Sequence, residues 1–118
     1  MKLRTNNTAK NRASHKISLD DKYALDTTRA YMTGIEALVR LPMLQHQRDS
    51  ERGINTAGFI SGYRGSPLGG VDQAMWKADN YLKQHNIKFV PGVNEDLAAN
   101  AVWGSQQVNL FGGAKYDG

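Results

Sequence analysis

The 118-residue sequence contains no cysteine and only three histidines. A disulfide scaffold is therefore excluded, and the chain cannot itself provide thiolate ligands for an iron–sulfur cluster or a cysteine-type zinc site. The histidines, His15, His46 and His85, do not have the spacing of metal ligands, so we expect no metal site in this sequence. Any redox metal that works with the chain must be bound outside it.

Long hydrophobic runs are also absent. No segment is apolar over the roughly 20 residues that span a bilayer, and the N-terminus has no apolar core of the kind found in secretory signals. Hydrophobic residues make up 40% of the chain and charged residues 22%, which is typical of one small soluble domain or of part of a larger one. We therefore expect no association with a membrane.

The basic residues are concentrated at one end of the chain. The net charge is +4, but residues 1–16 contain five Lys or Arg and no acidic residue, so the rest of the chain is nearly neutral. We interpret residues 1–17 as a disordered basic leader, because they are rich in Asn, Thr and Ser and poor in apolar residues. A nucleic-acid-binding arm and a transit peptide are less favoured alternatives, and nucleic acid is not an expected partner.

Apolar periodicity predicts three helices after this leader. In the first, over 28–48, Pro42 should introduce a kink or divide the helix in two. The second is expected over 71–85. The third begins at Glu95 and has apolar residues on most of its sides, so we expect it to be buried; Trp76 and Trp103 lie at core spacing and are interpreted as packing or interface residues.

Two short apolar segments, 55–61 and 87–90, are typical of buried strands. Because a helix is expected between them, they should be parallel and joined by a right-handed crossover. The predicted fold is α/β: a βαβ unit preceded by a helix. Two strands are too few for a stable parallel sheet, and residues 112–118 resemble a turn before a further strand. We therefore expect an incomplete doubly wound parallel sheet from a truncated, larger domain.

Ligands of open α/β sheets bind beyond the carboxyl ends of the strands, which here means the segments 62–70 and 91–95. The first is a loop with four glycines and a proline, but it matches neither the Walker A motif nor GxGxxG, and its short GxxG string does not indicate a KH domain. Arg64 is the only charged residue of this loop. Its planar guanidinium can bind a carboxylate or an aromatic ring, or it can simply be exposed.

Asn94 and Glu95 begin the third predicted helix. Asn94 is typical of an N-cap, and a glutamate in the first turn is stabilised by the helix dipole. Alternatively, Glu95 lies in a buried niche at the strand end, where desolvation raises its pKa and lets it hydrogen-bond or protonate a cofactor nitrogen. The residue pattern leaves both interpretations open. No catalytic triad of the hydrolase kind can be assembled from this sequence.

The sequence contains three segments that are far more specific than any short motif: NTAGFISGYRGSPLGG (55–70), PGVNEDLAANAVWGSQQVNLF (91–111) and GAKYDG (113–118). They resemble the N-terminal region of the indolepyruvate ferredoxin oxidoreductase family, and residues 20–53 resemble the segment that precedes it. The resemblance covers roughly residues 18–118 and leaves out only the leader. One departure is Gly112, where the family is expected to have proline.

The resemblance implies a cytoplasmic, thiamine diphosphate-dependent 2-oxoacid oxidoreductase. Such an enzyme decarboxylates an arylpyruvate such as indolepyruvate, transfers the acyl group to coenzyme A and passes two electrons through iron–sulfur clusters to ferredoxin. Residues 18–118 would be the start of the pyrimidine-binding domain, with a thiamine diphosphate-binding-like fold. Mg²⁺, the [4Fe-4S] clusters and coenzyme A would be bound by further domains beyond Gly118, and we expect the enzyme to be a homo-oligomer.

The resemblance also implies roles for five residues. Glu95 would hydrogen-bond the pyrimidine N1′ and activate the cofactor, with Asn94 beside it. The loop residues Ser66 and Pro67 would face the cofactor, and Arg64 and Ser66 would bind the substrate. The isolated chain would be inactive, because the cofactor in such enzymes spans two domains. The alternative is a small stand-alone accessory protein that binds a partner or an anionic ligand through the loop 62–70.

Overall fold

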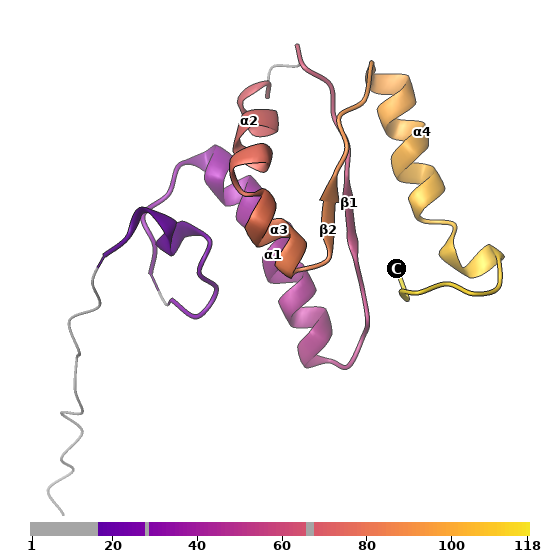
Figure 1. Ribbon diagram of the computed structural model, residues 1–118, viewed down its shortest axis with the longest axis horizontal. Helices are drawn as coiled ribbons and strands as arrows, with labels where there is room; N and C mark the ends of the chain where they lie inside the picture. The colour runs from indigo at the N-terminus through magenta and orange to yellow at the C-terminus, as the bar shows by residue number, and fades with distance from the viewer. Residues whose placement is uncertain (1–16, 28, 66–67) are drawn as a thin grey trace, which may run out of the picture.

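The computed structural model describes residues 17–27, 29–65 and 68–118. Residues 1–16 of the predicted leader, and Ser66 and Pro67 of the candidate loop, lie outside the described residues. The elements, in chain order, are η1 (Leu19–Lys22), α1 (Gly34–Glu51), β1 (Gly58–Ile60), α2 (Gly70–Lys77), α3 (Asp79–Gln84), β2 (Ile87–Phe89), α4 (Glu95–Ser105) and η2 (Val108–Leu110) (Figure 1).

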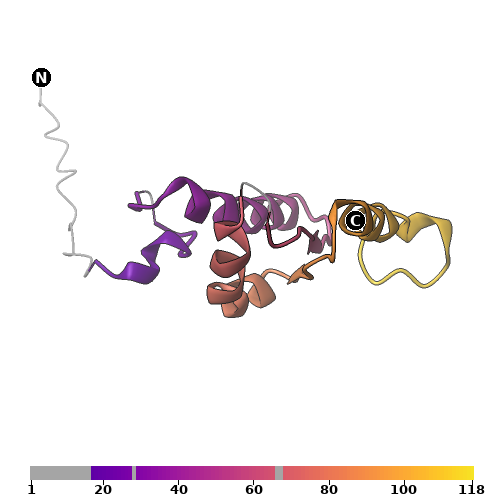
Figure 2. The same ribbon diagram turned by 90° about the horizontal axis from the view of Figure 1, so that it is seen from above.

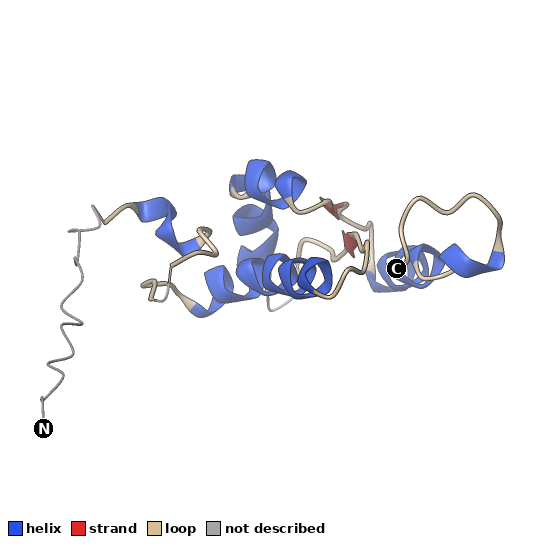
Figure 3. Cartoon of the chain, turned by 90° about the horizontal axis from the view of Figure 1, so that it is seen from below, coloured by secondary structure: helices blue, strands red, loops and turns tan. Residues whose placement is uncertain are grey.

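The two strands form a parallel pair, in which Gly58 lies opposite Ile87 and Ile60 opposite Phe89. The chain passes from β1 to β2 through α2 and α3, so the predicted βαβ unit preceded by a helix is confirmed. Figure 3 shows how short the strands are beside the helices. The described part of the chain is thus a mixed α/β structure with a two-stranded parallel sheet, and the larger doubly wound sheet stays a prediction.

The hydrophobic core lies on one side of the strand pair. α1, α2 and α3 lie to this side, whereas α4 lies to the other (Figures 1 and 2). The largest fully buried side chains of the core are Val39 and Met43 from α1 and Leu82 from α3. The buried cluster as a whole consists of Tyr23, Val39, Met43, Met75, Ala78, Leu82 and Ile87.

The helix α1 begins and continues differently from the prediction. It starts at Gly34 rather than near residue 28, because Thr33 forms a capping box with Glu36. It then continues through Pro42 to Glu51, so the predicted division into two helices is wrong. Pro42 lacks an N–H group, but Val39 and Met43 on either side of it are fully buried, and this packing holds both halves in one helix.

The second predicted helix is divided at Ala78 into α2 and α3. Alanine is a strong helix former, so the sequence around this position carries no signal for a break in the helix. Ala78 has no exposed surface, and its backbone angles (φ −91°, ψ 5°) turn the chain while Leu82 still donates to its carbonyl oxygen at 3.0 Å. The packing of the core therefore determines where this helix bends.

The helix α4 is largely exposed, so the prediction that it is buried on most sides is wrong. Of its residues only Ala98 is buried, whereas the side chains of Leu97 and Trp103 are 54% and 67% exposed. The reason is that α4 packs mainly against β1, and no other described helix covers its outer side. Trp103 is consequently not a core residue. Trp76 is about half exposed, and its ring packs edge-to-face on Phe89.

The C-terminal residues lie beside the start of β1. Asp117 donates its backbone N–H to the Asn55 carbonyl oxygen at 2.8 Å and accepts from the Asn55 N–H through its carboxylate at 2.9 Å. Ala57 donates to the carbonyl oxygen of Gly118 at 2.8 Å. Within the described parts of the chain, no helix combines the length and the hydrophobicity that crossing a bilayer requires.

The capping box of α1 should make the thermal stability of the protein depend on pH. The pKa of Glu36 is lowered to about 2 by hydrogen bonds from Lys22, at 2.6 Å, and from Thr33. Its stabilising effect is therefore complete above its usual pKa of 4.5 and is lost as the pH falls through about 2. We expect the difference in Tm between the wild type and Glu36→Gln to shrink between pH 5 and pH 2.

The control for this measurement is Glu51→Gln, at the other end of α1, where the carboxylate accepts an exposed hydrogen bond from the Gln47 side chain. Its Tm difference should be small, because one exposed hydrogen bond contributes little to stability. A Glu36→Gln difference that stays constant over the same range would contradict the assigned role of the carboxylate.

The close approach of Gly92 to α4 gives a second prediction. A Cβ atom at Gly92, which precedes α4, would lie 2.8 Å from the Ala98 Cβ and 3.2 Å from the Ala98 Cα. A Cβ atom at Gly104, within α4, would meet no atom within 4 Å. Gly92→Ala should lower the free energy of unfolding by about 1–3 kcal/mol through overpacking. Gly104→Ala should raise it by roughly 0.5–1 kcal/mol. Urea unfolding followed by circular dichroism tests both, and equal stabilities would contradict the packing.

Candidate functional site

The segments that follow the two strands lie side by side, as their position at the carboxyl ends predicted. Parallel pairing continues past the strands: Val90 donates to the Ile60 carbonyl oxygen at 2.9 Å, and Gly92 donates to that of Gly62 at 2.7 Å. These bonds connect the start of the glycine-rich loop to the segment that leads into α4. The first turn of α4 is thereby held next to the end of β1 (Figure 1).

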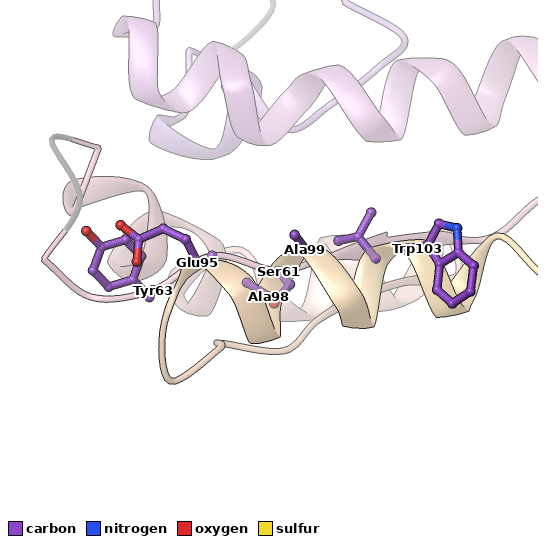
Figure 4. A pocket seen from close by; sticks show the side chains of 8 residues that line it. Ser61, Tyr63, Glu95, Ala98, Ala99 and Trp103 are labelled. Atoms are coloured by element: carbon purple, nitrogen blue, oxygen red, sulfur yellow. The ribbon is translucent and has the colours of Figure 1, made fainter.

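An open cleft of about 540 Å³ lies between these segments. The end of β1 contributes polar groups, among them the hydroxyls of Ser61 and Tyr63, and the carboxylate of Glu95 lies at the start of α4. The rest of the lining is apolar and comes from one side of α4 (Figure 4). The complete lining consists of Ser61, Gly62, Tyr63, Glu95, Ala98, Ala99, Val102 and Trp103.

Asn94 positions the beginning of α4. Its backbone is extended, and its Oδ1 atom accepts a hydrogen bond from the N–H of Leu97 at 2.9 Å, so the N-cap interpretation is confirmed. Glu95 follows as the first residue of the helix. The contact of Asn94 with a cofactor stays a prediction, because nothing in the described residues bears on it.

Glu95 is exposed, and its pKa is lowered rather than raised. The main cause is a hydrogen bond from the side chain of Tyr63, followed by one from the backbone N–H of Glu95 itself. The predicted buried niche with a raised pKa is therefore wrong for the described residues. The physical reason is that no described segment covers the first turn of α4, so water still solvates the carboxylate.

Tyr63 is the site residue that the sequence reasoning missed. It is partly exposed, and hydrogen bonding with the neighbouring Glu95 carboxylate is the main cause that raises the pKa of its phenol, followed by burial. Figure 4 shows its ring beside Glu95 at one end of the cleft. A signal was present, because alternate residues of an extended segment point to the same side, and Tyr63 follows Ser61 by two positions.

Arg64 follows Tyr63 in the same segment, and its side chain lies over the Trp76 ring. Its guanidinium carbon is 5.7 Å from the centre of the Trp76 ring on α2, so of the two predicted partners the structure contains the aromatic ring. Arg64 is exposed and does not line the cleft. Of the predicted site residues that the structure describes, Glu95 lines the cleft, whereas Asn94 caps α4 without lining it. Ser66 and Pro67 lie outside the described residues.

No group of three or more potential metal ligands occurs among the residues that could be searched for one. Comparison of the chain with known protein families, with curated proteins and with solved structures found no match. Function is therefore argued from the cleft and from the sequence segments themselves.

The hydrogen bond from Tyr63 generates a prediction for the isolated chain. Tyr63→Phe removes the donor that favours the charged form of Glu95, so the pKa of this carboxyl should rise toward its usual value of 4.5. NMR titration of the carboxyl carbon of the Glu95 side chain measures this pKa. Tyr116→Phe, at a tyrosine outside the cleft, is the control and should leave the titration unchanged. An unchanged pKa in Tyr63→Phe would disprove the interaction.

Proposed function

We propose that this chain forms the pyrimidine-binding part of a thiamine diphosphate-dependent 2-oxoacid:ferredoxin oxidoreductase, in which Glu95 activates the cofactor. The observation that carries the proposal is the position of Glu95: a carboxylate on the first turn of a helix, at the carboxyl ends of two parallel strands, beside an apolar cleft. Two of the three sequence segments that resemble the indolepyruvate ferredoxin oxidoreductase family, 55–70 and 91–111, contain the residues that line this cleft.

The residues of the cleft fit an aminopyrimidine ring. Such a ring needs a carboxyl group for its ring nitrogen and apolar surface against its faces. Glu95 offers the first, and Ala98, Ala99 and Val102 offer the second. The volume of about 540 Å³ also lies within the usual range for small-molecule sites. A flat ring over the first turn of α4 would displace water and raise the pKa of Glu95, which favours a carboxyl that shares its proton.

Bound thiamine diphosphate supplies the electron sink that the decarboxylation of a 2-oxoacid requires. In the proposed reaction Glu95 holds a proton at the ring nitrogen. The resemblance makes Arg64 the candidate for the substrate carboxylate: its exposed guanidinium has a planar pair of donors, although it lies over Trp76 and outside the cleft. The chain has no cysteine, so the iron–sulfur clusters, like Mg²⁺, coenzyme A and ferredoxin, would be bound by other parts of the proposed homo-oligomeric enzyme.

The test uses the protein encoded by the complete reading frame that contains residues 1–118. Glu95→Gln should lower the indolepyruvate-dependent reduction of ferredoxin by about 10²–10⁴-fold, because the amide cannot exchange a proton with the ring. Thiamine diphosphate should still bind, as measured by equilibrium dialysis. Asp96→Asn is a matched control in the same turn, since Asp96 does not line the cleft, and should retain activity. Near-normal turnover in Glu95→Gln would refute the proposal.

A further inference from the structure

Two histidines contact each other where α1 packs beside the end of α3. His46 lies on α1, and His85 is the residue at which α3 ends. Their ring centres are 5.6 Å apart and the ring planes are inclined by 77°, so the rings meet edge-to-face. Both side chains are only partly exposed. Two groups that can each take up a proton near neutral pH therefore join these two helices.

This histidine contact lies at the beginning of the strand pair, away from the cleft that contains Glu95. His85 is followed by Asn86, whose carbonyl oxygen accepts a hydrogen bond from the Gly58 N–H at 3.0 Å. His46 lines a smaller cleft of about 210 Å³ that is also lined by Gly58 and by Gly118. Figure 1 shows that α3 leads directly into β2 and that α1 leads through a turn into β1. Separation of the two rings would thus act on the beginning of both strands.

The contact is suited to neutral rings. The Nδ1 atom of His46 is buried and has no hydrogen-bond partner. A protonated imidazole has an N–H donor at both nitrogens, and a buried charged donor without an acceptor costs more free energy than a neutral nitrogen does. If both rings were protonated, their like charges would also repel each other across the contact. Protonation therefore favours a structure in which the rings are apart and solvated.

No described acidic group is free to compensate a proton on these rings. Neither imidazole takes part in the salt bridges of the described residues. Asp49 lines the same small cleft as His46, but its carboxylate already accepts from Gln45 at 2.8 Å and from Thr56 at 2.9 Å. The other charged residues on the segments around the pair are Arg48, Glu51 and Arg52 at the end of α1, Asp79 and Lys83 in α3, Lys88 in β2, and Lys115 and Asp117 near the C-terminal end.

We propose that the contact between His46 and His85 is a pH-sensitive switch: protonation separates the end of α3 from α1 and loosens the beginning of the strand pair. The cleft at the other end of the strands keeps its geometry, because the hydrogen bond between Gly92 and Gly62 does not involve these rings. This inference does not depend on the proposed function.

The direction of the pH dependence follows from the state of His85. Its pKa is lowered from the usual 6.5, mainly by burial and then by the charge of His46, which is the only charge that shifts it. The unfolded chain consequently binds this proton more readily than the folded one. The stabilising effect of the neutral ring is complete above pH 6.5 and is lost as the pH falls below this value. Glu36, with a pKa of about 2, acts in a separate and more acidic range.

His85→Phe tests the switch, because it keeps an aromatic ring against His46 and removes the group that takes up the proton. The Tm of the full chain should fall from pH 7.5 to pH 5 in the wild type and fall less in His85→Phe. Contacts that depend only on aromatic packing would give a Tm difference that does not vary with pH. His85→Gln, which also cannot be protonated, should show the same smaller dependence if the phenylalanine does not fit. Lys83→Gln is the control, since it changes a charge on α3 and leaves both rings in place.

Exchange of backbone amide hydrogens, measured by NMR and corrected for the intrinsic effect of pH, locates the opening. Between pH 7.5 and pH 5 the opening equilibrium of the Gly58 and Asp117 amides should rise by about 5-fold or more in the wild type. The amides of Val90 and Gly92, beside the larger cleft, should change little. An equal fall in Tm in the wild type and in both His85 variants, or an equal rise in exchange at Gly58 and Gly92, would overturn the proposal.

Discussion

The hydrogen bonds that extend the parallel pair beyond its strands determine the geometry of the candidate site. β1 and β2 are only three residues long, yet pairing continues from Val90 to Ile60 and from Gly92 to Gly62. Without the second bond, pairing would end at Val90, and the segment that carries Tyr63 would not be joined to the one that leads to Glu95. With it, a hydroxyl from one segment and a carboxylate from the other meet at the end of one cleft. The core of α1, α2 and α3 supports this arrangement by burying the other side of the strand pair.

The exposure of α4 explains the present electrostatics of the cleft. Because the outer side of this helix is uncovered in the described structure, Glu95 is solvated and its low pKa reflects its hydrogen bonds. The same exposure leaves Trp103 and Leu97 in contact with water. Exposed apolar residues on a helix that packs mainly against one strand are typical of a surface that another group covers. Covering this surface would change the acidity of Glu95 and the hydration of the tryptophan together.

Much of the fold followed from sequence patterns, because periodicity and strand order are local signals. The parallel pair, the N-cap at Asn94 and the meeting of the two post-strand segments were predictable in this way. The break at Ala78 was not, since alanine favours helices and the bend depends on tertiary packing. The burial of α4 was overestimated because an apolar pattern does not say what covers it. Tyr63 required the alternation of side chains to be followed past the end of the strand.

The hydrogen bonds between Asn55 and Asp117 join residues that are 62 positions apart. Closing a loop of this length costs conformational entropy, which only a few bonds offset at this point. We therefore expect the beginning of β1 to order late in folding and to open early when the native structure fluctuates. The segments that carry Tyr63 and Glu95 lie at the other end of the strand and are joined by the bond between Gly92 and Gly62. Exchange of backbone amide hydrogens should consequently be fast at the beginning of β1 and slow in the two segments beside the cleft.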